Sequence, residues 1–295
     1  MDIPTEVPTP TPEPDLPPEA AFSFSIGGLR TPYGVALSGE NIYVSDPGKN
    51  RVVIFDPEGN QIAAWEAEGS GDGEFNTFGF GGIAADANGN IFVVDNGNFR
   101  VQKFDSDGNF LLAWGSKGKE DGQFTRAIGI AVDADGNVYV TDDGNPFVQK
   151  FDNDGNFLMK WGGKGKEAGQ FEHATGIALD GAGNIFVADY ENRTVQKFDA
   201  AGGFLLMWKL EKTPGSLTGI PEGLAVDAQG QVYVTDYQNG AVQVFNNDGE
   251  YIWTWGTGGQ GDGELYRPSG IALDGQGKAY VVNQENNNLL VFELR

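Results

Sequence analysis

The sequence predicts an all-β fold, and three observations support this prediction. The 295 residues include 45 Gly, 20 Phe, 9 Tyr and 6 Trp, a composition typical of many turns that join aromatic-rich strands. A repeat of 47 or 48 residues runs through most of the chain, and almost every repeat contains four short apolar runs. The last repeat lacks its fourth run, and a matching run occurs near the N-terminus.

Six short words of the form GIAV mark the repeats. Their glycines are Gly34, Gly82, Gly129, Gly176, Gly223 and Gly270, with spacings of 48, 47, 47, 47 and 47 residues. Each word is followed by a turn such as ADGN, a strand such as VYVTD, a polar loop, a strand such as VQKFD, a turn such as SDGN and a strand such as FLLAWG. Four-stranded units at this period are typical of propeller blades, because one blade cannot bury both faces alone. We therefore expect a six-bladed β-propeller with four antiparallel strands per blade.

The sixth repeat indicates how the ring closes. It ends at Arg295 after three strands, while FSFSIG at residues 22–27 has the pattern of FLLAWG, with Ile26 in the tryptophan position. We expect this N-terminal strand to complete the sixth blade, which removes the exposed edges of an open array. The predicted propeller domain spans residues 21–295.

Residues 1–20 differ in composition from the rest. They hold seven of the fourteen prolines, interleaved with Thr and Glu, which predicts a disordered, polyproline-like tail or linker. Such a tail suits a tether, so we expect a secreted, periplasmic or surface-tethered protein; a disordered terminus without that role is the alternative. No run of eighteen apolar residues occurs, so we expect no direct insertion into a membrane.

Composition excludes several functions. The chain has no cysteine, which rules out disulfides, thiolate zinc sites and thiol catalysis. It has a single histidine, which rules out zinc sites with several His ligands. Its formal net charge of −23 opposes nucleic-acid binding, because such affinity comes largely from Lys and Arg at phosphates.

Most repeated residues have a structural explanation. A tryptophan recurs in the outer strand of five blades, and we expect these side chains to pack between blades. An aspartate ends the second strand of five blades, and in four of them an asparagine follows three residues later, typical of Asx turns. The tryptophans are Trp65, Trp114, Trp161, Trp208 and Trp255, and the strand-end aspartates are Asp46, Asp95, Asp142, Asp189 and Asp236.

The stretch FDSDGNFLLAWG, residues 104–115, resembles the start of a calcium loop. Its glycine is fourth from Asp105, whereas an EF-hand places glycine sixth, and Ser116 stands where a bidentate Glu is required. The pattern therefore predicts a β-hairpin turn and no metal site.

Alternating strand directions divide the turns between two faces. The hairpin face carries the first-to-second and third-to-fourth turns, with sixteen acidic residues and one basic residue, Lys278. The loop face carries the other connections and mixes acidic with basic residues. We therefore expect no basic surface for RNA on the loop face.

Candidate functional residues lie where the repeats differ. Three residues before the inner-strand glycine the blades carry Thr31, Gly79, Arg126, His173, Ile220 and Arg267. One residue before it they carry Tyr33, Gly81, Ile128, Thr175, Glu222 and Ser269. These positions should surround the mouth of the central channel, where Arg126, His173 and Arg267 would hold a small anion opposite Glu222. The plainer interpretation is that they are solvated loop residues.

Aromatic residues and a nearby arginine add to the loop face. They are Tyr33, Phe99, Phe147, Tyr190, Tyr237 and Tyr266, with Arg193 beside them in sequence. Aromatic side chains with Arg suit recognition of a polypeptide or a sugar ring. The predicted ligand-binding set is therefore Tyr33, Arg126, His173, Tyr190, Arg193, Glu222, Tyr237 and Arg267.

The repeats resemble those of the NHL family. The resemblance rests on the linkers KGKEDGQF, GSGDGEF and GGQGDGEL, each followed by GIAVD-like, GNVYVTD-like and VQKFD-like strands, and it covers residues 22–295. It implies a six-bladed propeller, but the family includes binding modules, sensors and a few enzymes. Its amidating lyases use a multi-histidine zinc site, which one histidine does not allow. Its calcium-dependent lactonase-like members leave calcium open as a cofactor, although Glu222 is the one obvious acid at the aligned mouth positions.

Three hypotheses follow. The main one is a non-enzymatic binding or scaffold propeller that presents its loop face to a protein, peptide or carbohydrate partner. The alternative is an enzyme of lactonase, esterase or lyase type at the channel mouth, with His173 or Glu222 as base and Arg126 and Arg267 holding an anionic substrate. The third is a subunit of a surface assembly, in which the tail docks on a neighbouring propeller.

Overall fold

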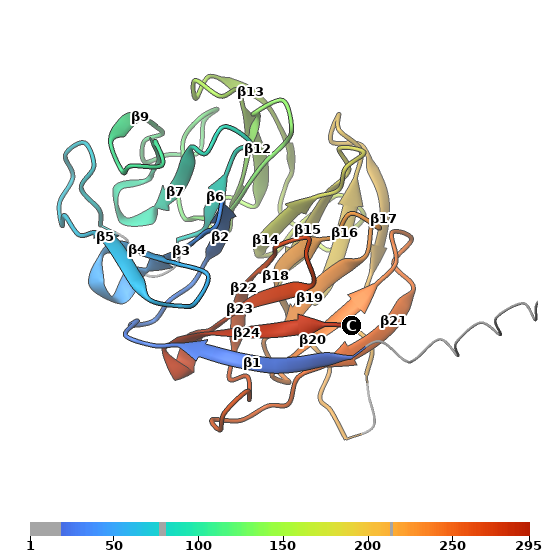
Figure 1. The fold of residues 1–295 in the computed structure, drawn as a ribbon. Coiled ribbons are helices and arrows are strands. Elements are labelled where there is room, and N and C mark those ends of the chain that lie inside the picture. The colour runs from blue at the N-terminus through green and yellow to red at the C-terminus, as the bar shows by residue number, and fades with distance from the viewer. Residues whose placement is uncertain (1–18, 77–80, 213–214) are drawn as a thin grey trace, which may run out of the picture.

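The computed structural model describes residues 19–76, 81–212 and 215–295, and it is a six-bladed β-propeller (Figure 1). Six antiparallel four-stranded sheets surround a central axis, as predicted. The first three blades are β2 (Val35–Ser38), β3 (Asn41–Asp46), β4 (Arg51–Phe55) and β5 (Gln61–Trp65); β6 (Ile83–Ala85), β7 (Ile91–Asp95), β8 (Arg100–Phe104) and β9 (Phe110–Trp114); and β10 (Ala127–Val132), β11 (Val138–Asp142), β12 (Phe147–Phe151) and β13 (Phe157–Gly162).

The next two blades are β14 (Ala174–Leu179), β15 (Ile185–Asp189), β16 (Thr194–Phe198) and β17 (Phe204–Trp208), then β18 (Pro221–Val226), β19 (Val232–Asp236), β20 (Ala241–Phe245) and β21 (Tyr251–Trp255). The sixth contains β22 (Pro268–Leu273), β23 (Lys278–Asn283) and β24 (Asn288–Leu294). Short 3₁₀ turns occur at η1 (Pro47–Lys49), η2 (Asn96–Asn98) and η3 (Gln284–Asn286).

The N-terminal strand closes the ring, as predicted. Strand β1 (Ala20–Ile26) pairs with β24, and the two lie side by side in Figure 1. Ile26 on β1 pairs with Leu289 on β24, just as Trp65 on β5 pairs with Val52 on β4. Ile26 therefore occupies the position that a tryptophan has in the other blades. Pairing reaches Glu19, whose backbone exchanges two hydrogen bonds with Arg295. Residues 1–18 of the predicted tail lie outside the described residues. Among the described residues, no helix is long and apolar enough to cross a membrane.

The repeated tryptophans join neighbouring blades, which confirms the packing prediction. Each stacks on or tilts against a phenylalanine in the third strand of the following blade, with ring centroids 4.7 to 5.9 Å apart. The pairs are Trp65–Phe104, Trp114–Phe151, Trp161–Phe198, Trp208–Phe245 and Trp255–Phe292. Five of the six interfaces between blades therefore have an aromatic pair near their outer edge, and Ile26 takes the place of the tryptophan at the sixth.

The linker motif is also structural. Phe124, which ends the linker KGKEDGQF, is fully buried against Phe151. The side chain of Gln149 on β12 accepts a hydrogen bond from Gly122 N–H (2.9 Å) and donates one to the Gln123 carbonyl (2.8 Å). The same pattern recurs with Gln102 and Gln196, so these residues of the repeat hold the linkers in place.

The hairpin aspartates form turns. Asp105 Oδ1 accepts hydrogen bonds from the N–H groups of Asp107 (3.0 Å) and Asn109 (2.8 Å), and Gly108 has a φ of 86°. The hydrogen bonds of Asn109 keep the pKa of Asp105 below its usual value. FDSDGN is therefore a hairpin corner, as predicted.

At the axis, the inner strands approach so closely that only glycine fits. A Cβ atom on Gly176 would lie 3.0 Å from Gly223 Cα and closer still to the Glu222 carbonyl oxygen. This approach allows a complete ring of hydrogen bonds between blades, with donor–acceptor distances of 2.5 to 3.3 Å. The bonds are Ser45 Oγ to Gly81 O, Gly82 N to Ile128 O, Thr141 Oγ1 to Thr175 O, Thr175 Oγ1 to Glu222 O, Thr235 Oγ1 to Ser269 O and Gly270 N to Tyr33 O.

We predict that Gly176→Ala lowers the free energy of unfolding by about 2 to 3 kcal/mol, because the new methyl group forces neighbouring backbones apart. Gly181→Ala is the matched control, since a Cβ at Gly181 meets no atom within 4 Å. Urea unfolding measures both. Equal stability of the two variants would contradict the role assigned to the axial contact.

Candidate functional site

The strand-end aspartates hold the backbone at the channel mouth. Asp142 accepts the N–H of Arg126 (2.8 Å), while the next residue, Asp143, donates its N–H to the Arg126 carbonyl (3.0 Å). The neighbouring blade repeats this arrangement, with Asp189 and Tyr190 binding the N–H and C=O of His173 (3.1 and 3.0 Å). A buried aspartate common to the blades therefore fixes positions whose side chains vary, which agrees with its predicted structural role.

This arrangement reveals a third variable position, immediately after the strand-end residue. The blades carry there Pro47, Asn96, Asp143, Tyr190, Tyr237 and Gln284. Two of these, Tyr190 and Tyr237, were predicted as loop-face aromatics, but Asp143 was missed. Its signal was available, because Asp143 is the one acid at this third aligned position.

A cavity of about 230 Å³ occupies the channel mouth on the loop face. Its polar lining comprises Arg126, Asp143, His173, Thr175, Tyr190, Glu222 and Tyr237. Five of the eight predicted site residues thus come together, from blades 3, 4 and 5. Next to this cavity lies a narrow channel, which is lined by the glycines of the inner strands and also by Tyr33 and Glu222. Gly79, at an aligned mouth position, lies outside the described residues.

Glu222 is a buried acid at the base of this cavity. Tyr33 Oη donates a hydrogen bond to Glu222 Oε1 (2.7 Å), and both side chains are about 95% buried. Burial raises the pKa of Glu222 to about 7, although the Tyr33 hydrogen bond opposes the shift. Burial, and then the charge of Glu222, raise the pKa of Tyr33. The interpretation of these two residues as solvated loop residues is therefore wrong, because the inner strand turns them toward the axis.

Glu222 also has an oxygen available to a ligand. Within the described residues its Oε2 accepts no hydrogen bond, while Oε1 is bound by Tyr33. A carboxyl group with a pKa near 7 exists in both protonation states at neutral pH, and can therefore accept or give a proton.

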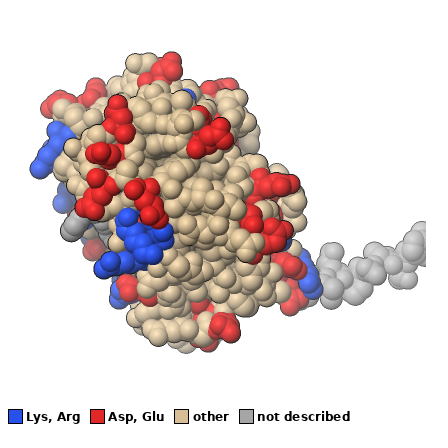
Figure 2. All heavy atoms as spheres, turned by 60° about the vertical axis from the view of Figure 1, so that its left-hand side comes forward, with Lys and Arg blue, Asp and Glu red and all other residues tan. Residues whose placement is uncertain are grey.

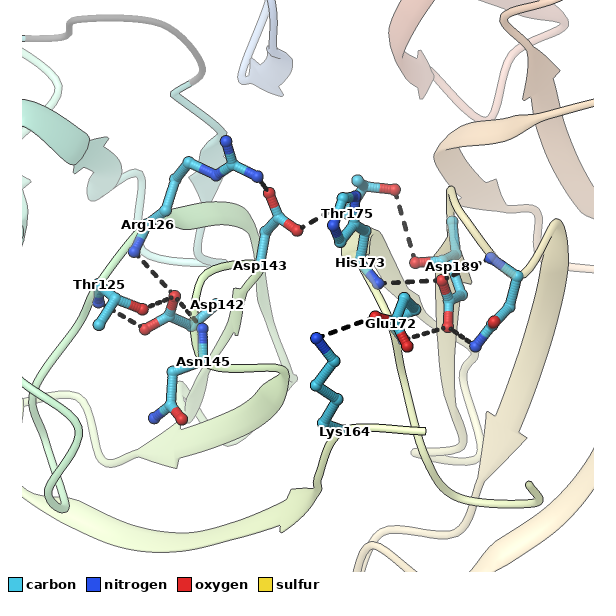
Figure 3. A network of polar contacts seen from close by, with 12 residues as sticks. Thr125, Arg126, Asp142, Asp143, Asn145, Lys164, Glu172, His173, Thr175 and Asp189 are labelled. Atoms are coloured by element: carbon cyan, nitrogen blue, oxygen red, sulfur yellow. Dashed lines mark hydrogen bonds and ion pairs between the residues drawn. The ribbon is translucent and has the colours of Figure 1, made fainter. Parts of the chain in front are cut away.

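Asp143 lies between Arg126 and His173 (Figure 3). Its Oδ2 forms an ion pair with Arg126 Nη2, and its Oδ1 lies 3.7 Å from His173 Nδ1. The Asp143 side chain is only 4% exposed, and Oδ1 has no hydrogen-bond partner in the described part of the chain. A buried carboxylate facing an imidazole can orient the ring and compensate a positive charge on it.

The remaining predicted residues lie beside this cavity. Arg267 stands over the rings of Tyr237 and Tyr266, with its Cζ 5.5 and 5.8 Å from their centroids, and pairs with Glu285 at 3.1 Å. It therefore borders the mouth without lining the cavity. Arg193 donates to the Thr218 carbonyl (2.8 Å) and lines no described cavity, so the structure does not bring it into the site.

The acids at the mouth are few for a calcium site. Calcium takes six to eight oxygen ligands, whereas Asp143 and Glu222 each have one oxygen bound already, by Arg126 and by Tyr33. Across residues 19–76, 81–212 and 215–295, no group of three or more His, Asp or Glu side chains is placed to hold a metal.

Charge elsewhere on the protein is largely negative. Figure 2 shows acidic side chains scattered over the surface it presents, with basic ones confined to a few places. Arg126, His173 and Arg267 at the mouth therefore stand out against a chain of net charge −23.

Comparison with known proteins identifies the repeats and the fold. The NHL repeat model matches residues 81–104, 124–151, 171–198 and 218–245. No curated protein sequence is recognisably similar to this chain. Among solved structures, a gluconolactonase of Xanthomonas campestris is 16% identical, with a TM-score of 0.68 over 92% of this chain and 88% of that one.

Two lyases are also similar. A streptogramin B lyase is 12% identical, with a TM-score of 0.66 over 94% of this chain and 98% of that one. A virginiamycin B lyase of Staphylococcus aureus is 12% identical, with a TM-score of 0.63 over 94% and 99%.

At these identities the likeness establishes the fold alone, yet all three proteins are enzymes by description. Our main hypothesis of a non-enzymatic binding scaffold is therefore wrong by this comparison, which favours the enzyme alternative. The aligned repeats placed Arg126, His173 and Glu222 at the mouth, but they did not show that Glu222 is buried against Tyr33 or that Asp143 lies between Arg126 and His173.

We predict that Glu222 makes stability depend on pH. Its pKa is about 7 in the folded protein and 4.5 in a solvated reference, so the folded state binds this proton more tightly. The resulting stabilisation is complete below about pH 4.5 and is lost as pH rises through 7, a change of about 3 kcal/mol.

Urea unfolding from pH 5 to 8 tests this prediction. Glu222→Gln keeps an acceptor for Tyr33 but cannot titrate, so its stability should decline less over this range than that of the unsubstituted protein. Glu191→Gln, at an exposed position on the same face, should follow the unsubstituted protein. Parallel pH curves for the protein and the Glu222 variant would contradict the buried titration.

Proposed function

Since this chain is a six-bladed propeller built from NHL repeats, we propose that it is an enzyme of lactonase, esterase or lyase type that breaks a carbon–oxygen bond at the channel mouth. The observation that carries the proposal is the buried Glu222 carboxyl, which lines the same cavity as the Arg126–Asp143–His173 cluster. The descriptions of the similar solved structures, a gluconolactonase and two lyases, support this class of reaction.

Glu222 is the proposed proton acceptor. With an ester or lactone, its carboxylate takes a proton from water as the water oxygen bonds to the acyl carbon. In an elimination, it takes the proton from the carbon next to the one that bears the leaving oxygen. Tyr33 acts as a positioning residue, because its hydrogen bond fixes Oε1 and leaves Oε2 for the reacting proton.

His173 is the proposed proton donor. In its protonated form it gives a proton to the departing oxygen as the carbon–oxygen bond breaks, and Asp143 orients the ring and compensates its charge. The Arg126 side chain is half exposed, and only its Nη2 is bound within the described residues. Its remaining N–H groups are free to bind a substrate carboxylate or an oxygen that gains charge.

We expect turnover of at least one substrate in a panel of lactones and esters. Glu222→Gln should lower kcat/KM about 10²- to 10⁴-fold, since it removes the proton acceptor. His173→Asn should cause a loss of similar order, while Glu191→Gln should leave activity unchanged. The profile of kcat/KM against pH should rise through about pH 7, as Glu222 ionises.

The single histidine provides a second measurement. Histidine-selective labelling yields one imidazole signal, which should shift on addition of a turned-over lactone and on Asp143→Asn. Activity should be the same with calcium or with a chelator. Full activity of the Glu222 and His173 variants, or no turnover across the panel, would defeat the proposal.

A further inference from the structure

A groove on the loop face runs outward from the cavity, between blades 5 and 6. It has a volume of about 780 Å³, within the range of about 300 to 1,000 Å³ typical of small-ligand sites. Tyr190 and Tyr237 line both the groove and the 230 Å³ cavity that contains Glu222. The tyrosine pair therefore forms a boundary that the two spaces share.

Two glycines line the groove at positions that carry larger side chains in other blades. In blade 2, Phe99 follows Asp95 by four residues, and Lys117 of the next linker lies over its ring at 5.1 Å. At the corresponding positions of blade 5 and its linker stand Gly240 and Gly258, and both line the groove. Their backbones meet there, since a Cβ atom on Gly240 would lie 2.6 Å from Gly258 Cα, so the Phe–Lys pair of blade 2 has no equivalent in the groove.

The groove is lined by aromatic rings and neutral polar groups. Tyr190 and Tyr237 pack edge to face with centroids 5.6 Å apart, and Tyr266 is 38% exposed. Arg267, which stands over Tyr237 and Tyr266, is the one charged side chain in the lining. Gln238 and Gln260 are exposed and make no hydrogen bond within the described residues, so their amides are available to a ligand.

We propose that this groove binds a linear oligosaccharide and delivers its terminal unit to the cavity at Glu222. Sugar rings present a C–H face that packs on tyrosine rings, and hydroxyl groups that exchange hydrogen bonds with side-chain amides and Arg. The groove residues thus form outer subsites, and the carbon–oxygen bond that breaks, in a terminal lactone or ester or beside a uronate carboxyl group, lies at the Tyr190–Tyr237 boundary. That last assignment rests on the proposed enzymatic function, whereas binding in the groove does not.

A sugar chain fits better than a peptide for two reasons. A peptide bound by its side chains needs apolar pockets, and the aliphatic lining is Leu265, which is fully buried. A peptide bound by its backbone needs an unpaired strand edge, and the lining residues belong to loops and linkers. The groove therefore offers a peptide neither apolar pockets nor a strand edge. Its aromatic faces and free amides are suited to the C–H face and the hydroxyl groups of a pyranose ring.

Calorimetric titration of the full chain with linear hexasaccharides tests the binding. The probes are cellohexaose, xylohexaose, mannohexaose, chitohexaose and hexagalacturonate, the last distinguishing an acidic sugar that pairs with Arg267. We expect a Kd below 1 mM for at least one of them. Tyr266→Ala and Arg267→Ala should each weaken it about ten-fold or more.

Tyr251→Ala is the matched control, because Tyr251 has a similar exposure (40%) but lies on the outer strand β21. It should bind as the unsubstituted protein does. Absence of binding to all five probes would overturn the proposal, as would binding that the Tyr266 and Arg267 variants leave unchanged. Binding of an unstructured acidic peptide, weakened by those variants in the absence of sugar binding, would overturn it in favour of a polypeptide ligand.

A second comparison separates the groove from the reaction. Glu191→Gln should bind the hexasaccharide with unchanged affinity, since Glu191 is exposed and lines neither the groove nor the cavity. Sugar binding that depends on Tyr266 and persists in a protein without any lactonase or esterase turnover would support the groove and reject the enzyme. Turnover of small lactones without sugar binding would support the enzyme and reject the groove.

Discussion

The close contact of the inner strands around the axis is the constraint on which the rest of the structure depends. Glycine at each of the six aligned positions lets neighbouring backbones meet, and six hydrogen bonds then link the blades in a closed ring. The acceptors are the carbonyls of the residues just before those glycines. Glu222 and Tyr33 occupy this position, so the contact that closes the propeller also buries their side chains together.

In the blades, the residues that hold the backbone at the mouth are different from the residues whose side chains line the cavity. A buried strand-end aspartate holds the backbone of the mouth residues in each of blades 3, 4 and 5, whatever side chain they carry. Because the backbone is held by shared residues, the side chains at these positions are free to differ between blades. Asymmetry of the mouth, with acids, a histidine and tyrosines on different blades, thus arises on a nearly symmetric support.

The chemistry of the site follows from burial within a strongly acidic protein. Most carboxylates of this chain lie on the surface, where water and turn amides stabilise their charge; Asp105 is an example, and its pKa is lowered. Glu222 has only the Tyr33 hydroxyl and a low-polarity surrounding, so its pKa rises to about 7. Carboxyl groups therefore hold turns on one face, while a buried one is our proposed proton acceptor at the other.

The sequence by itself determined the blade count, the closing strand, the packing of the tryptophans and most positions at the mouth. These features depend on periodicity and on turns within a few residues, which a linear pattern records. Only the tertiary structure decided that Tyr33 meets Glu222 across 189 residues, that Asp143 lies between Arg126 and His173, and that Arg193 points elsewhere. The physical reason is that the contacts of Tyr33 with Glu222 and of Asp143 with His173 cross between blades, where the curvature of the closed ring sets which variable side chains meet. The repeat pattern assigns each residue to a blade and to a position along the propeller axis, but it does not show which residue of another blade it contacts.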